Sequence, residues 1–123
     1  MNKPLALIYY SNLMPGSHLT MLLQELGYEV QAVSDAAMLA ESCEKETPLV
    51  VIAELFPAAD VCAAVARLKG NPATRHVPVL GYCQMCDAAA QAQARKAGVD
   101  LLAAQGGVAE QLPQLLDQIL QVE

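Results

Sequence analysis

A pair of cysteines carries the sharpest chemical signal in this sequence. Cys83 and Cys86 form a Cys-x-x-Cys motif that follows an apolar run and precedes an alanine-rich stretch. A dithiol at a junction between a strand and a helix suits redox chemistry, because a helix N-terminus lowers the pKa of a thiol. The tryptophan and the Gly-Pro pair typical of thioredoxin motifs are missing, so a helix start made of small residues is the alternative interpretation.

Cys62 suggests a second kind of chemistry, which is zinc binding. It falls at the start of an expected helix and should open on the same edge of the sheet, where three thiolates and His18 could bind zinc. A zinc site normally shows two paired ligand motifs, and this sequence has one. Cys43 falls on the apolar side of another expected helix and is interpreted as a core residue. The uneven spacing of the four cysteines in so apolar a chain predicts that the thiols are reduced.

The stretch PLVVIAELFP, residues 48–57, organises the expected sheet. Its unbroken apolar run is typical of a strand whose two faces are covered by helices. Ligands bind beyond the carboxyl ends of such strands, so Ala53 and Glu54 decide the chemistry. Side chains alternate across a strand, and these two residues therefore cannot face the same site. We expect Glu54 to point to the solvent rim, because unpaired acids are seldom buried.

Apolar strands and helical segments alternate along the whole chain. The expected strands cover residues 5–10, 28–33, 48–57, 77–83 and 100–103. Crossovers between parallel strands are right-handed and return each strand to the same sheet. The pattern predicts an α/β fold in which a five-stranded parallel sheet is flanked by five helices in three layers.

Local signals predict where several helices begin. Ser17 is expected to cap the first helix, and Ser34 or Asp35 the second. The glycine pair at 106–107 is expected to form a turn before the last helix. Pro113 implies that this last helix starts late or bends, because a proline past the first turn removes a backbone hydrogen bond.

Length and charge exclude several classes of function. The 123 residues predict a single domain, residues 1–123, with no room for a second. The net charge of −6 and the absence of a basic cluster argue against nucleic-acid binding. No apolar run approaches the roughly 20 residues of a membrane helix, and no signal peptide is evident, so a cytoplasmic protein is expected. Signatures of nucleotide-binding loops, zinc proteases and hydrolase triads are absent from the sequence.

Four stretches together resemble the receiver domain of bacterial two-component response regulators. They are ELGYEV at 25–30, PLVVIAELFP at 48–57, LKGNPATRHVPVL at 68–80 and KAGVDLL at 96–102, in the order and spacing of that family. The resemblance spans nearly the whole chain. It implies a CheY-like, flavodoxin-like sheet with the strand order 2-1-3-4-5.

The resemblance also implies where a phosphorylation site would lie. Receivers use two acidic residues to hold Mg²⁺, an aspartate to accept the phosphoryl group, a serine or threonine, and a lysine. Those positions fall here on Tyr10 and Ser11, on Ala53, on Cys83 and on Gln105. None of these residues has a carboxylate side chain, so none can hold Mg²⁺ or accept a phosphoryl group in the way that receivers do. The chain is therefore interpreted as a degenerate pseudo-receiver.

The first hypothesis is a phosphorylation-independent signalling or scaffolding module. It would be no enzyme, would need no cofactor or Mg²⁺, and would act by binding a protein partner or a second copy of itself. Tyr9 and Tyr10 would fill the emptied site, and a receiver that keeps activity through Glu54 should fail for want of metal ligands. The alternative is a thiol redox or ligand-sensing protein that uses Cys83 and Cys86. The interaction face implied by the resemblance comprises Leu101, Leu102, Leu116, Leu120 and Val122.

Overall fold

Five strands form one parallel sheet in the described part of the computed structural model. The structure describes residues 4–10, 13–33, 35, 37–46, 48–55, 58–83 and 88–120, without the side chains of 13–16, 58–59, 105–106 and 120. The strands are β1 (Leu5–Tyr9), β2 (Glu29–Val33), β3 (Val50–Glu54), β4 (Val79–Cys83) and β5 (Leu101–Ala104). Their order is β2-β1-β3-β4-β5, which confirms the predicted topology.

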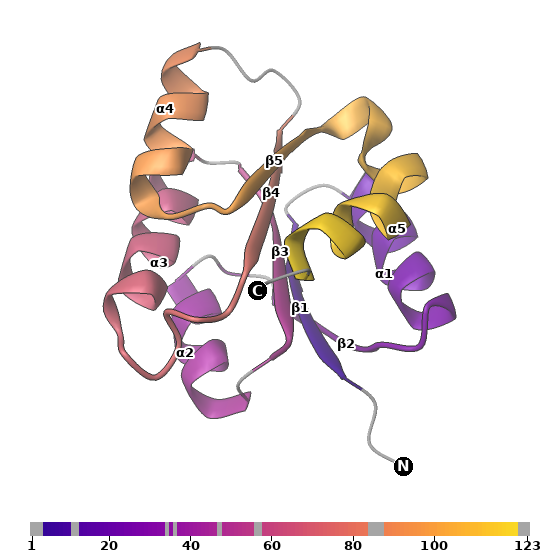
Figure 1. Cartoon of the computed structure of the whole chain (residues 1–123), viewed down its shortest axis with the longest axis horizontal. Helices are drawn as coiled ribbons and strands as arrows, with labels where there is room; N and C mark the ends of the chain where they lie inside the picture. The colour runs from indigo at the N-terminus through magenta and orange to yellow at the C-terminus, as the bar shows by residue number, and fades with distance from the viewer. Residues whose placement is uncertain are drawn as a thin grey trace.

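Helices cover both faces of this sheet and give three layers (Figure 1). The helices are α1 (Leu13–Glu25), α2 (Ala37–Glu46), α3 (Ala58–Gly70), α4 (Ala88–Ala97) and α5 (Gln105–Leu120). Helices α1 and α5 lie on one face, and α2, α3 and α4 lie on the other. None of these helices is long and apolar enough to cross a membrane.

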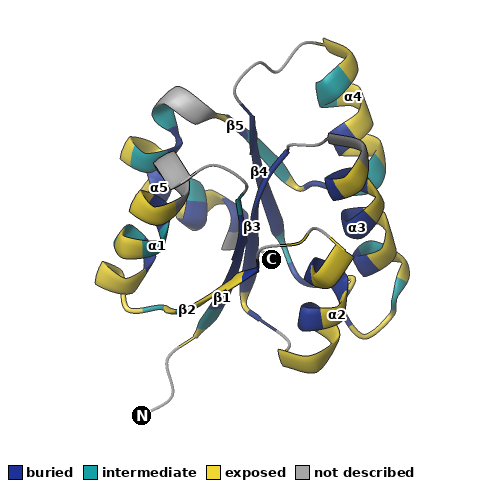
Figure 2. Cartoon of the chain, turned by 180° about the vertical axis from the view of Figure 1, so that it is seen from behind, coloured by how far each residue is buried: buried dark blue, intermediate teal, exposed yellow. Residues whose placement is uncertain are grey.

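The hydrophobic core is divided by the sheet into two clusters. Alternate residues of β1, β3 and β4 point to opposite faces, so Val51 belongs to the same cluster as Val65 of α3, whereas Ile52 belongs to the cluster of Leu112 of α5. Every residue of β3 and β4 is buried, and these two strands are accordingly dark blue in Figure 2. Each large apolar side chain buried in this way contributes roughly 1.5–3 kcal/mol, so the sheet is held by both helical layers.

Two helices begin earlier than the sequence pattern predicts. Helix α1 starts at Leu13, so Ser17 lies inside the helix and is not its cap. Pro15 falls in the first turn, where the missing backbone N–H is not needed. Helix α5 starts at Gln105 and includes the glycine pair expected as a turn, and it continues past Pro113. Of the two predicted caps for α2, Asp35 is confirmed, because its Oδ1 accepts the Ala37 N–H at 3.0 Å.

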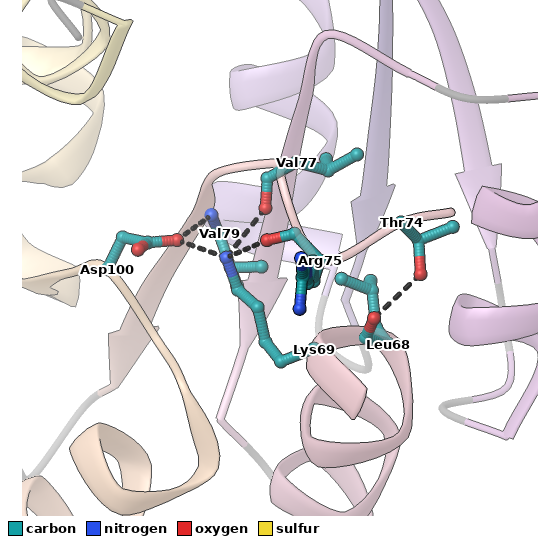
Figure 3. Close-up of polar contacts among 7 residues, drawn as sticks. All are labelled: Leu68, Lys69, Thr74, Arg75, Val77, Val79 and Asp100. Carbon is teal, nitrogen blue, oxygen red and sulfur yellow. Dashed lines mark hydrogen bonds and ion pairs between the residues drawn. The ribbon is translucent and has the colours of Figure 1, made fainter. Parts of the chain in front are cut away.

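The amino end of β4 is fastened by a polar network (Figure 3). The Lys69 ammonium at the end of α3 donates to the Val77 carbonyl at 2.8 Å and to Asp100 Oδ2 at 2.8 Å. The same carboxylate oxygen accepts the Val79 N–H at 2.8 Å. Lys69 thus joins α3, the start of β4 and the residue before β5, and Asp100 closes the network.

Candidate functional site

The carboxyl ends of β1, β3 and β4 meet at one edge of the sheet. In the register of the parallel pairs, Tyr9 lies opposite Ala53 and Glu54 lies opposite Tyr82. Cys83, the last residue of β4, follows directly. Parallel sheets bind ligands beyond this edge, so these five residues define the candidate site.

Ala53 occupies the centre of the candidate site. It is fully buried and belongs to the core cluster on the side of α2 and α3, together with Tyr9 and Cys83. A methyl group can neither ligate a cation nor accept a phosphoryl group. At this position the site therefore offers packing and no reactive group.

Glu54 lies one residue further on and points to the opposite face. The prediction that it faces the solvent rim was wrong, because only 3% of the residue is exposed. Its neighbour in the register is Tyr82, which packs in the core cluster on the side of α1 and α5. Strand alternation places Glu54 inside, and this geometric requirement outweighs the general preference of acids for the surface.

Tyr82 is the largest fully buried side chain near the site. Burial raises the pKa of its phenol, and the nearby charge of Glu54 raises it further, with smaller contributions from Tyr10 and Tyr9. Its hydroxyl is buried and has no hydrogen-bond partner among the residues that the structure describes. A buried hydroxyl without a partner costs about 1–3 kcal/mol, so this edge carries an unsatisfied polar group.

Carboxylates act on Tyr9, although the next two residues of the chain, Tyr10 and Ser11, are not acidic. Burial raises the pKa of the Tyr9 phenol, and the charges of Glu54, Asp35 and Asp60 raise it further, in that order. Asp35 caps α2 and Asp60 lies in the first turn of α3. Three carboxylates from separate positions of the chain therefore act on the Tyr9 phenol.

The described residues nevertheless contain no cluster suited to a metal ion. Among them, no three His, Cys, Asp or Glu side chains come together as a ligand set. Hard cations such as Mg²⁺ need several oxygen ligands in a defined geometry. The carboxylates that act on Tyr9 come from β3, from α3 and from the residue that caps α2, and they supply charge without a coordination shell.

The cysteines differ in their state. Cys83 is disulfide-bonded, whereas Cys43 and Cys62 are free and buried. This corrects the expectation that all thiols are reduced. Cys86, the remaining cysteine of the sequence, lies outside the described residues. Burial raises the pKa of Cys62 and raises that of Cys43 to about 12, so neither free thiol has the low pKa of a reactive cysteine.

The zinc hypothesis finds no support in this arrangement. Cys62 and Cys83 do share the core cluster on the side of α2 and α3. His18, however, belongs to α1, which covers the other face of the sheet (Figure 1). A disulfide also removes Cys83 from any set of thiolate ligands. The prediction that Cys43 is a core residue is confirmed, because this residue is fully buried.

Comparison with known proteins identifies the fold that carries this site. No protein-family model and no curated protein matches the sequence. Among solved structures, a candidate response regulator from Chloroflexus aurantiacus is 21% identical, with 98% of this chain and 100% of that chain covered and a TM-score of 0.88. The chain has the receiver-domain fold.

Two further structures agree with the receiver fold at lower identity. The receiver domain of a sensor histidine kinase from Pseudomonas aeruginosa is 18% identical over 98% of this chain and 100% of that chain, with a TM-score of 0.87. That structure holds a magnesium ion in its active-site cleft. A response regulator from Thermotoga maritima is 12% identical over the same shares, with a TM-score of 0.84. At these identities the likeness shows the fold alone.

The predicted interaction face of this receiver fold is only partly at the surface. Leu101 and Leu102 are half-buried in β5, which is an edge strand of the sheet. Leu116 is 4% exposed and packs in the core, which contradicts its assignment to the interaction face. Leu116 lies on the apolar face of α5 that packs against the sheet. The side chain of Leu120 and all of Val122 lie outside the described residues.

The positions expected to carry phosphorylation in a receiver are described in part. Tyr10 is half-buried against the cluster on the side of α1 and α5. Ser11 and the side chain of Gln105 lie outside the described residues. Sequence reasoning missed Tyr82, although a tyrosine in an otherwise aliphatic buried strand was a visible signal. It also missed Asp35 and Asp60 as sources of charge near Tyr9, which no local pattern predicts.

Proposed function

We propose that this chain is a pseudo-receiver, a signalling or scaffolding module that works without phosphorylation and has no enzymatic activity. The observation that carries the proposal is Ala53, buried at the end of β3. Phosphoryl transfer to a receiver needs a carboxylate nucleophile and a metal to neutralise the incoming charge. Ala53 supplies no nucleophile, and Glu54 points to the other face of the sheet. The proposal includes a cytoplasmic, bacterial setting.

A phosphodonor experiment tests this proposal directly. The purified chain is incubated with acetyl phosphate and Mg²⁺, and intact mass spectrometry measures phosphorylation at neutral pH. We expect no adduct in the native chain and none in Glu54→Gln. An acid-labile adduct that disappears in Glu54→Gln would refute the proposal and assign the acceptor to Glu54. A receiver with an intact phosphorylation site serves as the positive control.

The proposed action is binding of a protein partner or of a second copy through the β5 edge. Edge strands present unpaired backbone groups, and Leu101 and Leu102 add half-buried apolar surface there. Light scattering after size exclusion measures self-association of the native chain and of Leu102→Glu. The exposed leucine Leu49, which precedes β3, provides the matched control Leu49→Glu. Association that Leu49→Glu weakens as much as Leu102→Glu would argue against this edge.

A thiol redox role is the second candidate function. The observation that favours it is the disulfide at Cys83, in place of the hydroxyl that receivers carry. Cys43 and Cys62 are free, so we propose Cys86 as its partner within the chain. Reduction by an external dithiol would break the sulfur–sulfur bond with two electrons and two protons, leaving two thiols and an oxidised disulfide on the reductant.

Counting thiols separates the two candidates. Alkylation and mass spectrometry are performed on the denatured chain before and after treatment with a dithiol. A redox role predicts that Cys83 and Cys86 become labelled only after reduction, and reversibly so. Cys83→Ser should then leave Cys86 labelled without reductant, whereas Cys62→Ser should leave the pair protected. Thiols that are all labelled even after treatment with a mild oxidant would exclude the redox role.

A further inference from the structure

A cavity lies at the opposite end of the sheet from the candidate functional site. Its volume is about 430 Å³, and it is lined by residues just before β4 and β5 and near the end of α5. Pockets of roughly 300 Å³ and more are large enough for small organic ligands. The cavity has a polar part, formed by Arg75, His76 and Gln118, and an apolar part, formed by Pro78, Leu101 and Ile119.

The acidic group in this cavity is already neutralised. Asp100 is its one lining carboxylate among the described residues, and its Oδ2 accepts hydrogen bonds from Lys69 and from the Val79 N–H, both at 2.8 Å. Lys69 and Asp100 therefore form an ion pair with no net charge (Figure 3). The net charge of the cavity therefore depends on its lining side chains other than Lys69 and Asp100.

Arg75 is a cation without a counterion in the described part of the chain. The ion pairs there join Lys69 to Asp100 and Arg67 to Glu44. Asp117, which precedes Gln118 in α5, is not among the residues that line the cavity. The described residues that line the cavity thus carry a net positive charge, although the whole chain carries a net charge of −6.

The loop that carries Arg75 is held in place before any ligand arrives. The Arg75 N–H donates to the Asn71 carbonyl at 2.8 Å, and the Arg75 carbonyl accepts from Lys69 Nζ at 3.3 Å. The buried Thr74 hydroxyl donates to the Leu68 carbonyl at 2.6 Å. Because the backbone is already ordered, a ligand would lose little free energy in fixing this loop.

We propose that this cavity binds a small organic anion, with a phosphate or carboxylate group at Arg75 and an apolar or planar body against Leu101 and Ile119. A guanidinium binds such anionic groups with two parallel hydrogen bonds. His76 and the Gln118 amide add donors beside it. The site is independent of the pseudo-receiver proposal, because it lies at the other end of the sheet.

Titration of the isotope-labelled full chain with phenyl phosphate tests the proposal. Amide chemical shifts in two-dimensional NMR report binding, and inorganic phosphate, benzoate and phenol are titrated in parallel. We expect saturable shifts at Arg75, His76, Leu101 and Ile119 with phenyl phosphate, and weaker binding of phosphate alone and of phenol. Benzoate that binds equally well shows that the site accepts either anionic group, and benzoate that binds more weakly identifies the phosphate as the preferred group.

Charge-removing variants make the test specific. Arg75→Gln should weaken phenyl phosphate binding at least about tenfold, because the charged fork is lost. Arg95→Gln is the matched control, since Arg95 is an exposed arginine in the last turn of α4 and does not line the cavity. His76→Gln should weaken binding to a smaller extent. Absence of saturable shifts, equal binding by Arg75→Gln, or equal binding of phenol would overturn the proposal.

Discussion

Replacing Lys69 with methionine should destabilise the protein by about 2 kcal/mol. The change keeps the aliphatic stem of the side chain and removes its ammonium, which donates to Val77 and to Asp100 at 2.8 Å each. The partly buried Val77 carbonyl is then unpaired, at a cost of about 1–3 kcal/mol. Loss of the ion pair adds about 0–1 kcal/mol, because 42% of the Asp100 side chain is exposed and solvent screens the attraction.

Urea unfolding followed by far-ultraviolet circular dichroism measures this effect, since the chain has no tryptophan to report by fluorescence. Lys96→Met is the matched control: Lys96 is an exposed lysine in the last turn of α4, and its loss should change stability by less than about 0.5 kcal/mol. Asp100→Asn combined with Lys69→Met isolates the pair in a double-mutant cycle. If Lys69→Met is as stable as Lys96→Met, the network in Figure 3 does not support the fold as we describe it.

Three further predictions concern other buried groups. Tyr82→Phe should stabilise the protein by about 1 kcal/mol in urea unfolding, because it removes a buried hydroxyl that has no partner in the described part of the chain, and a loss of stability would show that the hydroxyl is satisfied. The raised pKa of Cys43, about 12, means that its contribution to stability is complete below about pH 9 and is lost as pH rises toward 12. When the pH rises from about 8 to about 10, the free energy of unfolding of Cys43→Ala should therefore fall by about 1 kcal/mol less than that of the native chain. Equal decreases would contradict the raised pKa of Cys43. Gly98→Ala should destabilise by about 1–3 kcal/mol, because Gly98 has φ +116° and an added Cβ would lie 2.6 Å from Lys69 Cγ. Gly70→Ala meets no atom within 4 Å and should be close to neutral, so equal effects of the two substitutions would count against this explanation.

The architecture could be predicted from the sequence because its signals are local and repeated. Strands such as β3 are continuous apolar runs, and the intervening helices show their buried faces at regular spacing, as with Val61 and Leu68 of α3. The starts of α1 and α5 were misplaced because proline and glycine near a helix start permit both a loop and a first turn. Packing of α5 on the sheet decides between these two outcomes, and packing is not a local signal.

The candidate site was less predictable because its decisive features are tertiary. Glu54 is buried because side chains alternate along β3 and both faces of this strand are covered by helices. The general preference of acids for the surface therefore predicted the wrong environment for it. The Lys69–Asp100 pair joins residues 31 positions apart, and neither residue carries a local mark of that contact. The disulfide at Cys83 contradicts the expectation of reduced thiols that composition suggested.

The division of the core by the sheet has a consequence for synthesis of the chain on the ribosome. Leu19 and Leu23 of α1 are made early, yet the cluster that buries them also contains Val108 and Leu112 of α5, the last helix to emerge. Helices α2 and α3 can cover their face of β1 and β3 much sooner, because they lie adjacent in the chain. A nascent or truncated chain without α5 would therefore expose the apolar side of α1, and such exposed surface is where chaperones bind and where aggregation starts.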